Sequence, residues 1–123
     1  MERRTDMPYV EVITNAKLNT AAEVAIKAGL GRLLYEIAGK DEQWLMVRIV
    51  SEEELFFKGS SDTHNAFVEI RYVGSFTSSV KQKLTQAIGQ LLQETAKIQP
   101  DKLYVHFVGG SGSDWGWKGE LLG

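Results

Sequence analysis

The sequence contains no cysteine among its 123 residues, which excludes disulfide bonds, catalysis by a thiolate and zinc sites built on sulfur. Histidine is almost as scarce, with only His64 and His106, so a histidine-rich metal site is not expected. No apolar run approaches the roughly 20 residues of a membrane span, and residues 1–6 lack the apolar stretch of a signal peptide. We therefore expect a cytoplasmic protein without metal, cofactor or membrane contact, which leaves non-classical export as the route out of the cell.

Excess charge is lacking as well. The formal net charge of −2 provides no general attraction to nucleic acid or to an anionic membrane. Hydrophobic residues make up 43% of the chain, which argues against disorder. A chain of 123 residues is long enough to bury the core of one domain.

Proline occurs only twice, and both positions are informative. Pro100 lies just past a predicted helix, where a helix end is expected. Pro8 directly follows Met7 and opens a strand-like run over residues 9–14. As an amino-terminal residue, Pro8 would carry a secondary amine able to act as a base or a nucleophile. With Met7 attached, the same nitrogen is an amide without useful basicity, so function depends on whether residues 1–7 are present.

The chain is organised as a duplicated strand–helix–strand unit. Residues 9–13 (YVEVI) resemble residues 67–71 (FVEIR), a helical pattern follows each, and strand-like runs follow over 44–49 and 103–107. Thr20 and Glu23 form a capping-box pattern for the first helix, and Gly39 suits the left-handed position after it. The second helix is expected to begin within 77–79. Both helices carry an apolar stripe at helical spacing: Ile26, Leu30, Leu33, Leu34 and Ile37, then Leu84, Ile88, Leu91, Leu92 and Thr95.

The predicted strands have two different faces. One face is apolar and suits the two helices: Val10, Val12, Leu45, Val47, Ile49, Val68, Ile70, Leu103, Val105 and Phe107. The other mixes aromatic and charged residues: Tyr9, Glu11, Trp44, Arg48, Phe67, Glu69, Arg71, Tyr104 and His106. Two helices cannot cover both faces of a four-stranded sheet, and aromatic residues with arginine are typical of an interface core. We expect a closed homo-oligomer built across this face, with a solvated sheet as the alternative.

Two irregular stretches complete the chain. Residues 51–65 are long for a hairpin connection, and a short strand is expected around Phe56 and Phe57. Residues 109–123 are rich in glycine but carry Trp115 and Trp117. Because flexible linkers rarely carry tryptophan, we expect this tail to fold back on the domain or on a neighbouring subunit.

Together these residues resemble the macrophage migration inhibitory factor branch of the tautomerase superfamily. The resemblance runs from Pro8 to Gly123, and its individual motifs are weak, but their order and spacing are fairly specific. The motifs are Met7-Pro8 heading a strand with Thr14-Asn15 at its end, Gly39-Lys40, Phe57-Lys-Gly-Ser-Ser61, Val73-Gly74, Pro100-Asp-Lys-Leu-Tyr104 and Gly116-Trp-Lys-Gly119. We divide the chain into an extension, residues 1–7, and a single tautomerase-like domain, residues 8–123.

The resemblance implies an α+β fold of two βαβ units, with a four-stranded mixed sheet and two helices on one face. It also implies a homotrimer and cofactor-free keto–enol tautomerisation of 2-keto acids such as phenylpyruvate. Pro8 would be the general base, and Lys40 with the backbone of Val73 would bind the substrate. Tyr104 and His106 would reach into the pocket of a neighbouring subunit. Trp44, Trp117 and Leu122 would form the apolar pocket wall.

Some positions depart from the family pattern. His106 stands where asparagine is frequent, so we expect a changed polar contact that depends on pH. Asp41 follows Lys40 where proline is common, and Lys58 replaces a glycine. The gravest departure is the extension itself, because it leaves Pro8 as an amide.

Three functions remain in competition. The first is an isomerase with Pro8 at its amino terminus. The second is a non-catalytic trimeric binding or cytokine-like protein, its receptor unknown, in which the extension blocks Pro8. The third is a ferredoxin-like RNA-binding domain with Trp44 and Tyr104 stacking on bases; the acidic balance and the missing aromatic-glycine pattern argue against it.

Overall fold

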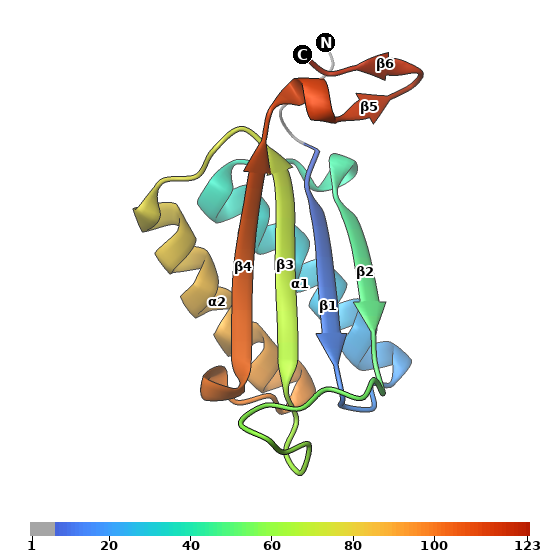
Figure 1. The fold of residues 1–123 in the computed structure, drawn as a ribbon, viewed down its shortest axis with the longest axis vertical. Helices are drawn as coiled ribbons and strands as arrows, with labels where there is room; N and C mark the ends of the chain where they lie inside the picture. The colour runs from blue at the N-terminus through green and yellow to red at the C-terminus, as the bar shows by residue number, and fades with distance from the viewer. Residues whose placement is uncertain (1–6) are drawn as a thin grey trace.

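The computed structural model describes residues 7–123, which fold into a four-stranded sheet, two long helices and a small C-terminal hairpin (Figure 1). The main elements are β1 (Tyr9–Thr14), α1 (Thr20–Ala38), β2 (Met46–Val50), β3 (Ala66–Val73), α2 (Ser78–Ala96) and β4 (Leu103–Gly110). The short elements are η1 (Glu42–Trp44), η2 (Pro100–Lys102), η3 (Gly112–Asp114), β5 (Gly116–Trp117) and β6 (Glu120–Leu121).

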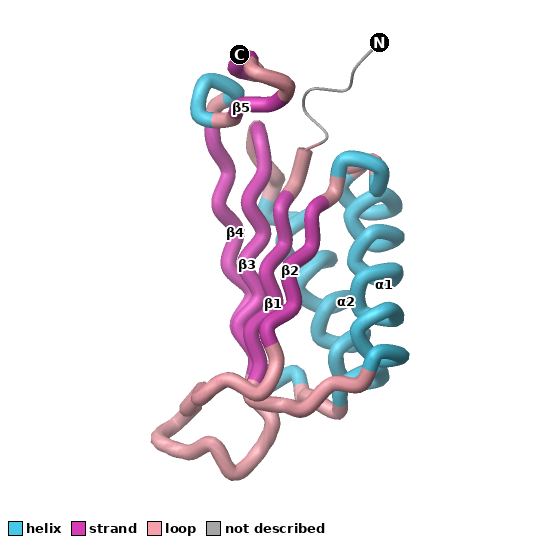
Figure 2. The backbone as a smooth tube through the Cα atoms, turned by 90° about the vertical axis from the view of Figure 1, so that its right-hand side faces the viewer, coloured by secondary structure: helices cyan, strands magenta, loops and turns pink. Residues whose placement is uncertain are grey.

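The sheet has the strand order β2-β1-β3-β4. β1 runs parallel to β2, β3 runs parallel to β4, and the two pairs join through the antiparallel contact of β1 with β3. Each parallel pair and its helix form one βαβ unit, so the predicted repeat and the α+β class are confirmed. Both helices lie on the same side of the sheet (Figure 2). Within residues 7–123, no helix covers the opposite side, which we call the open face.

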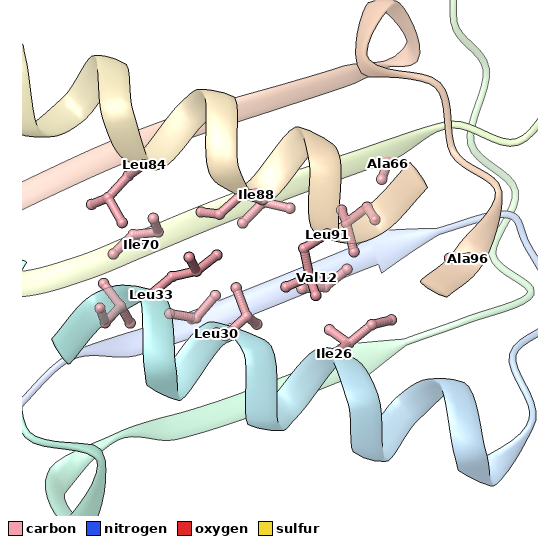
Figure 3. Packing of buried hydrophobic residues seen from close by; sticks show 14 of the residues in the cluster. Val12, Ile26, Leu30, Leu33, Ala66, Ile70, Leu84, Ile88, Leu91 and Ala96 are labelled. Carbon is pink, nitrogen blue, oxygen red and sulfur yellow. The ribbon is translucent and has the colours of Figure 1, made fainter. Parts of the chain in front are cut away.

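The hydrophobic core fills the space between the helices and the sheet (Figure 3). Its fully buried members include Val10, Val12, Ile26, Leu30, Leu34, Val68, Ile70, Leu84, Ile88 and Leu92. The predicted apolar residues of the edge strands β2 and β4 are half-buried and pack against this core. The predicted stripes therefore describe the core correctly, and Thr95 fits because its hydroxyl donates to the Leu91 carbonyl at 2.7 Å.

The helix ends agree with the sequence at three positions and differ at one. Gly39 adopts the left-handed conformation (φ 70°) after α1, Thr77 caps α2, and Pro100 lies past its end. The predicted capping box at Thr20 is wrong, because Asn19 is the N-cap and its side chain accepts from the backbone N–H of Ala22 at 2.8 Å. Asparagine is a strong N-cap residue in the extended conformation that Asn19 adopts, so Thr20 becomes the first helical residue.

β2 begins two residues later than the sequence pattern predicts. The side chain of Asp41 accepts from the backbone N–H of Gln43 at 3.0 Å and caps η1, which contains Trp44. The placement of Trp44 on the open face of the strand is therefore wrong. Exposed Met46 opens β2 instead, opposite Tyr9 of β1.

The two irregular stretches take different forms. The expected strand near Phe56 and Phe57 is reduced to a single bridge between Phe57 and Ser60. The tail is ordered as predicted: η3 and the β5–β6 hairpin lie beyond the C-terminal end of β4 (Figure 1). Trp117 of β5 contacts Trp44 of η1, so the tail folds back on its own domain at the end of the sheet where β1 begins.

Candidate functional site

Pro8 directly precedes β1 and is buried. Its carbonyl oxygen accepts a hydrogen bond from the N–H of Met46 at 3.1 Å, which fixes the proline against the start of β2. The preceding residue, Met7, is 7% exposed. A proline suits this place because the first residue of a strand loses little by lacking an N–H.

Pro8 borders a cavity of about 820 Å³ at the same end of the sheet. The walls come from three parts of the chain: the start of β1, the η1–β2 segment, and the stretch from the end of β4 into β5. The lining residues are Met7, Pro8, Tyr9, Gln43, Trp44, Leu45, Met46, Arg71, Val108, Gly109, Gly110, Asp114, Trp115, Gly116 and Trp117. A concave, largely apolar pocket with a few polar groups is the usual form of a small-molecule site.

All three tryptophans of the chain line this cavity. Trp44 and Trp117 meet edge to face, with ring centroids 5.0 Å apart and planes at 87°. The indole N–H of Trp44 is buried and has no hydrogen-bond partner among residues 7–123. The predicted roles of Trp44 and Trp117 thus correspond to an aromatic wall that the structure brings together, and Trp115 extends it.

Leu122 occupies a different position from its two predicted wall partners. It is not among the lining residues in the described part of the chain. Its backbone N–H donates to the carbonyls of Trp115 (2.9 Å) and Gly112 (3.2 Å). Leu122 therefore ties the end of the tail to η3 and Trp115.

Lys40 and Val73 lie together beside the pocket. Gly39 ends α1 in the left-handed conformation, and the N–H of Lys40 then donates to the carbonyl of Leu34 at 3.0 Å. This turn buries the Lys40 side chain, whose Nζ donates to the Val73 carbonyl at 3.2 Å and lies 5.8 Å from the centre of the Phe76 ring. β3 pairs with Tyr9 at Arg71 and continues to Val73, so Val73 lies at the Pro8 end of the sheet. Neither Lys40 nor Val73 is among the described residues that line the cavity.

Tyr104 and His106 lie on the open face, away from the pocket of their own chain. In the β4 register, Tyr104 is opposite Phe67 and His106 is opposite Glu69, whereas the pocket residue Val108 is opposite Arg71. Tyr104 is four residues from Val108, or roughly 13 Å along a strand. Tyr104 is 62% exposed and His106 is exposed too. Both are therefore available to another copy of the chain.

The cavity contains polar residues that the sequence did not indicate as site residues. The sequence pattern predicts Arg71 as an interface or solvated charge, and it indicates no role for Gln43 or Asp114. Arg71 enters the lining because β1 and β3 pair it with Tyr9, the residue after Pro8. The repeat of Tyr9-Val-Glu in Phe67-Val-Glu was the available signal, since pairing the two repeats antiparallel at their glutamates places Arg71 beside Tyr9.

Charged residues on the open face gather around two glutamates, Glu11 and Glu69. Arg48 Nη1 lies 3.0 Å from Glu11 Oε2, which also accepts from the Tyr9 hydroxyl at 2.9 Å. Burial, and then the neighbouring Glu11, raise the pKa of Tyr9. Glu69 pairs with Arg71 Nε and with His106 Nδ1, the latter at 3.1 Å. The hydrogen bond from His106, followed by that from Arg71, holds the pKa of Glu69 below its ordinary value.

Two further observations concern metal binding and membrane spans. Residues 7–123 contain no group of histidine, aspartate and glutamate side chains arranged to hold a metal ion. In the same range, neither helix is long and apolar enough to cross a membrane.

Paired βαβ units with two helices on one face and a strand-opening proline beside an end-of-sheet pocket define the α+β tautomerase fold. The chain belongs to the macrophage migration inhibitory factor family, whose sequence profile matches residues 7–123. It is 26% identical over 116 residues to macrophage migration inhibitory factor of Meriones unguiculatus, covering 94% of this chain and 99% of that protein. The homolog from Trichinella spiralis is also 26% identical over 116 residues, covering 94% of this chain and all of that one, 100%.

Solved structures agree on the fold. Leishmania major MIF2 superposes with a TM-score of 0.85 at 23% identity, covering 94% of this chain and 97% of that chain. The homologue from Prochlorococcus marinus gives 0.85 at 21% identity, covering 94% and 99%. Pt0534, solved after inactivation by 2-oxo-3-pentynoate, gives 0.81 at 14% identity, covering 92% and 94%.

Proposed function

We propose that this chain, when Pro8 is its amino-terminal residue, catalyses the keto–enol tautomerisation of phenylpyruvate-type 2-keto acids. The observation that carries the proposal is the position of Pro8 on the border of the cavity of about 820 Å³, beside the aromatic wall of Trp44, Trp115 and Trp117. The wall suits the phenyl ring of such a substrate, and the proline suits the proton transfer.

The chemistry requires a free secondary amine on Pro8. A free α-amine has a reference pKa of about 7.7–8.0, and burial disfavours its charged form. The neutral amine takes a proton from the carbon next to the ketone while the carbonyl oxygen becomes an enol, and the reverse transfer regenerates the ketone. In the chain as it stands, Met7 is bonded to the Pro8 nitrogen, whose lone pair is delocalised into the amide. The mechanism therefore needs the Met7–Pro8 bond to be cut or never made.

The remaining residues of the proposal come from two subunits. Lys40 and the Val73 carbonyl, joined at 3.2 Å, lie at the Pro8 end of the sheet and would contribute to substrate binding from the same chain. Tyr104 and His106 point out of the open face and would reach the pocket of a neighbour in a homotrimer. This arrangement accounts for their distance from Pro8 within one chain.

The second candidate is a trimeric binding protein without turnover, and Met7 favours it. Met7 is 7% exposed and lines the same cavity, so it belongs to the pocket in the present chain. In that form the pocket has an aromatic wall but no amine base.

Activity of two forms tests the proposal. The chain of residues 1–123 and a chain beginning at Pro8 are compared for phenylpyruvate tautomerisation, with each amino terminus verified by intact mass. We expect turnover only from the second form, and Pro8→Gly in that form should lower turnover by 10²-fold or more, in the range of general base catalysis. Equal activity of the 1–123 form would contradict a proline base. An inactive Pro8-initiated form would favour the binding protein.

A covalent probe gives an independent test. Because 2-oxo-3-pentynoate inactivates the structural relative Pt0534, it is a reasonable reagent for this chain. The neutral amine would add to C4, the alkyne carbon that bears the methyl group, forming a carbon–nitrogen bond, while the amine proton moves to C3, the carbon next to the ketone. The Pro8-initiated chain should gain the mass of one reagent molecule on its first peptide, and the 1–123 chain should not. Labelling at any other residue would contradict the assignment of the nucleophile.

A further inference from the structure

We propose that Arg71 is the anion-binding residue of the Pro8 pocket and selects ligands that carry a carboxylate beside an aromatic group. The inference deepens the proposed function, since it rests on the same pocket and names the chemistry that recognises its ligand. It concerns binding, so it can stand or fall independently of turnover.

Arg71 is the cationic side chain in the described wall of the cavity. The charged lining residues are Arg71 and Asp114, and the buried Nζ of Lys40 is directed to the Val73 carbonyl outside that lining. A carboxylate that enters beside Pro8 therefore meets the guanidinium of Arg71 as its positive partner within the cavity.

The guanidinium of Arg71 is oriented by two contacts that leave its fork open. Nε donates to Glu69, and the guanidinium carbon lies 5.4 Å from the centre of the Tyr9 ring. Within residues 7–123, the hydrogen bond of the Arg71 side chain to Glu69 is made by Nε, which leaves Nη1 and Nη2 for another acceptor. Two parallel donors at a fixed spacing match the two oxygens of a carboxylate, and orientation in advance reduces the entropy lost on binding.

Arg48 lies on the same open face of the sheet as Arg71 but does not line the cavity. Its terminal Nη1 donates to Glu11 at 3.0 Å, so its fork is already engaged. Arg48 is exposed to a similar degree, with side-chain exposure of 63% against 50% for Arg71, but it does not belong to the described lining of the cavity. The difference between the two arginines lies in which nitrogen holds the glutamate. Arg48 is therefore a matched control.

Binding can be measured with the intact chain of residues 1–123, because all three tryptophans line the cavity and report its occupancy by fluorescence. The probes are 3-phenylpropanoate and its methyl ester, which have the same ring but differ in charge. We expect the acid to bind at least about tenfold more tightly than the ester, as a charge-assisted bidentate contact predicts. Arg71→Ala should abolish this preference, Arg71→Lys should restore part of it, and Arg48→Ala should leave it intact.

Several results would overturn the inference. These are equal affinity for acid and ester in the unsubstituted protein, an unchanged preference in Arg71→Ala, or an equal loss in Arg48→Ala. The first comparison needs no variant, so it remains decisive if a substitution disturbs folding. Absence of saturable binding by the acid would overturn it too. Failure of the proposed function is a different result: acid binding that depends on Arg71, with no phenylpyruvate turnover in the chain that begins at Pro8.

Discussion

At the scale of single residues, the open face of the sheet is organised by two glutamates, each shared between two partners. Glu11 accepts from Tyr9 and Arg48, and Glu69 is held by Arg71 and His106. Both glutamates are more enclosed than their arginines, with side-chain exposures of 15% and 16%. The glutamates thus fix the exposed groups, and Glu69 in particular sets the orientation of the pocket residue Arg71.

Replacement of Glu69 by glutamine should change how stability depends on pH. The pKa of Glu69 is lower in the folded chain than its ordinary value of 4.5, so near that pH the unfolded chain binds more protons. The stabilisation is complete above about pH 4.5 and is lost as the pH falls through the folded pKa. Glu69→Gln should therefore unfold more easily at neutral pH, by about 0.5–1 kcal/mol, and approach the unsubstituted protein in acid. Urea titrations at one protein concentration across this range measure it.

The matched control for Glu69 is Glu94→Gln on α2, where the carboxylate accepts from Gln90 at 3.2 Å. It should shift stability little at any pH. An equal pH response in the two variants would refute the shared-glutamate interpretation.

Removal of the charge of Asp114 should strengthen the binding of an acid in the pocket. Asp114 lines the cavity together with Arg71, and its charge would repel the carboxylate that we propose for Arg71. Asp114→Asn is nearly isosteric, so we expect 3-phenylpropanoate to bind roughly two- to fivefold more tightly at low salt, with a smaller effect at high salt. Tryptophan fluorescence measures the affinity. The methyl ester and the remote Asp101→Asn should show no change, and tighter binding of the ester would contradict an electrostatic cause.

At the scale of elements, the first turn of α1 is stabilised by Asn19 rather than by the predicted Thr20. The side chain of Asn19 accepts from the N–H of Ala22, whereas Thr20 is already helical. Asn19→Ala should lower the free energy of unfolding by about 1 kcal/mol, and Thr20→Ala should have little effect. Thermal or urea unfolding of the two variants gives the comparison directly. A larger loss of unfolding free energy for Thr20→Ala would support the predicted capping box at Thr20 instead.

The same scale explains which elements the sequence could predict. Each helix stripe repeats a local spacing, so Ile26 and Leu84 are recognisable as core positions without knowledge of the fold. The start of β2 is not recognisable in this way, because the alternation continues back to Trp44. Trp44 belongs to the η1 turn, which is held by the side-chain cap of Asp41 on the Gln43 N–H and by backbone hydrogen bonds from Trp44 to Asp41 and from Leu45 to Glu42. An alternating pattern does not contain these local competitors.

At the scale of the whole molecule, the pocket combines predictable and unpredictable parts. Pro8 and the tryptophans could be proposed because their residue types are unusual where they occur. Residue type and charge do not separate Arg71 from Arg48, and the repeat of Tyr9-Val-Glu in Phe67-Val-Glu does so only when the two strands are paired antiparallel. Only the antiparallel register of β1 with β3 and the return of the tail over that end of the sheet distinguish the two arginines. The contact of Trp117 with Trp44 likewise joins two segments with no pattern in common.

The open sheet face supplies the last prediction, which concerns assembly. Tyr35 on the outer side of α1 and Tyr104 on the open face are each 62% exposed in the single chain. If the sheets of a homotrimer face inward, Tyr104 becomes buried and Tyr35 does not. Tyr104→Glu would then place an unpaired charge in an interface, which costs several kcal/mol, while Tyr35→Glu would stay in water. Sedimentation at micromolar concentration should show trimers for Tyr35→Glu and smaller species for Tyr104→Glu, and trimers of both would place the interface elsewhere.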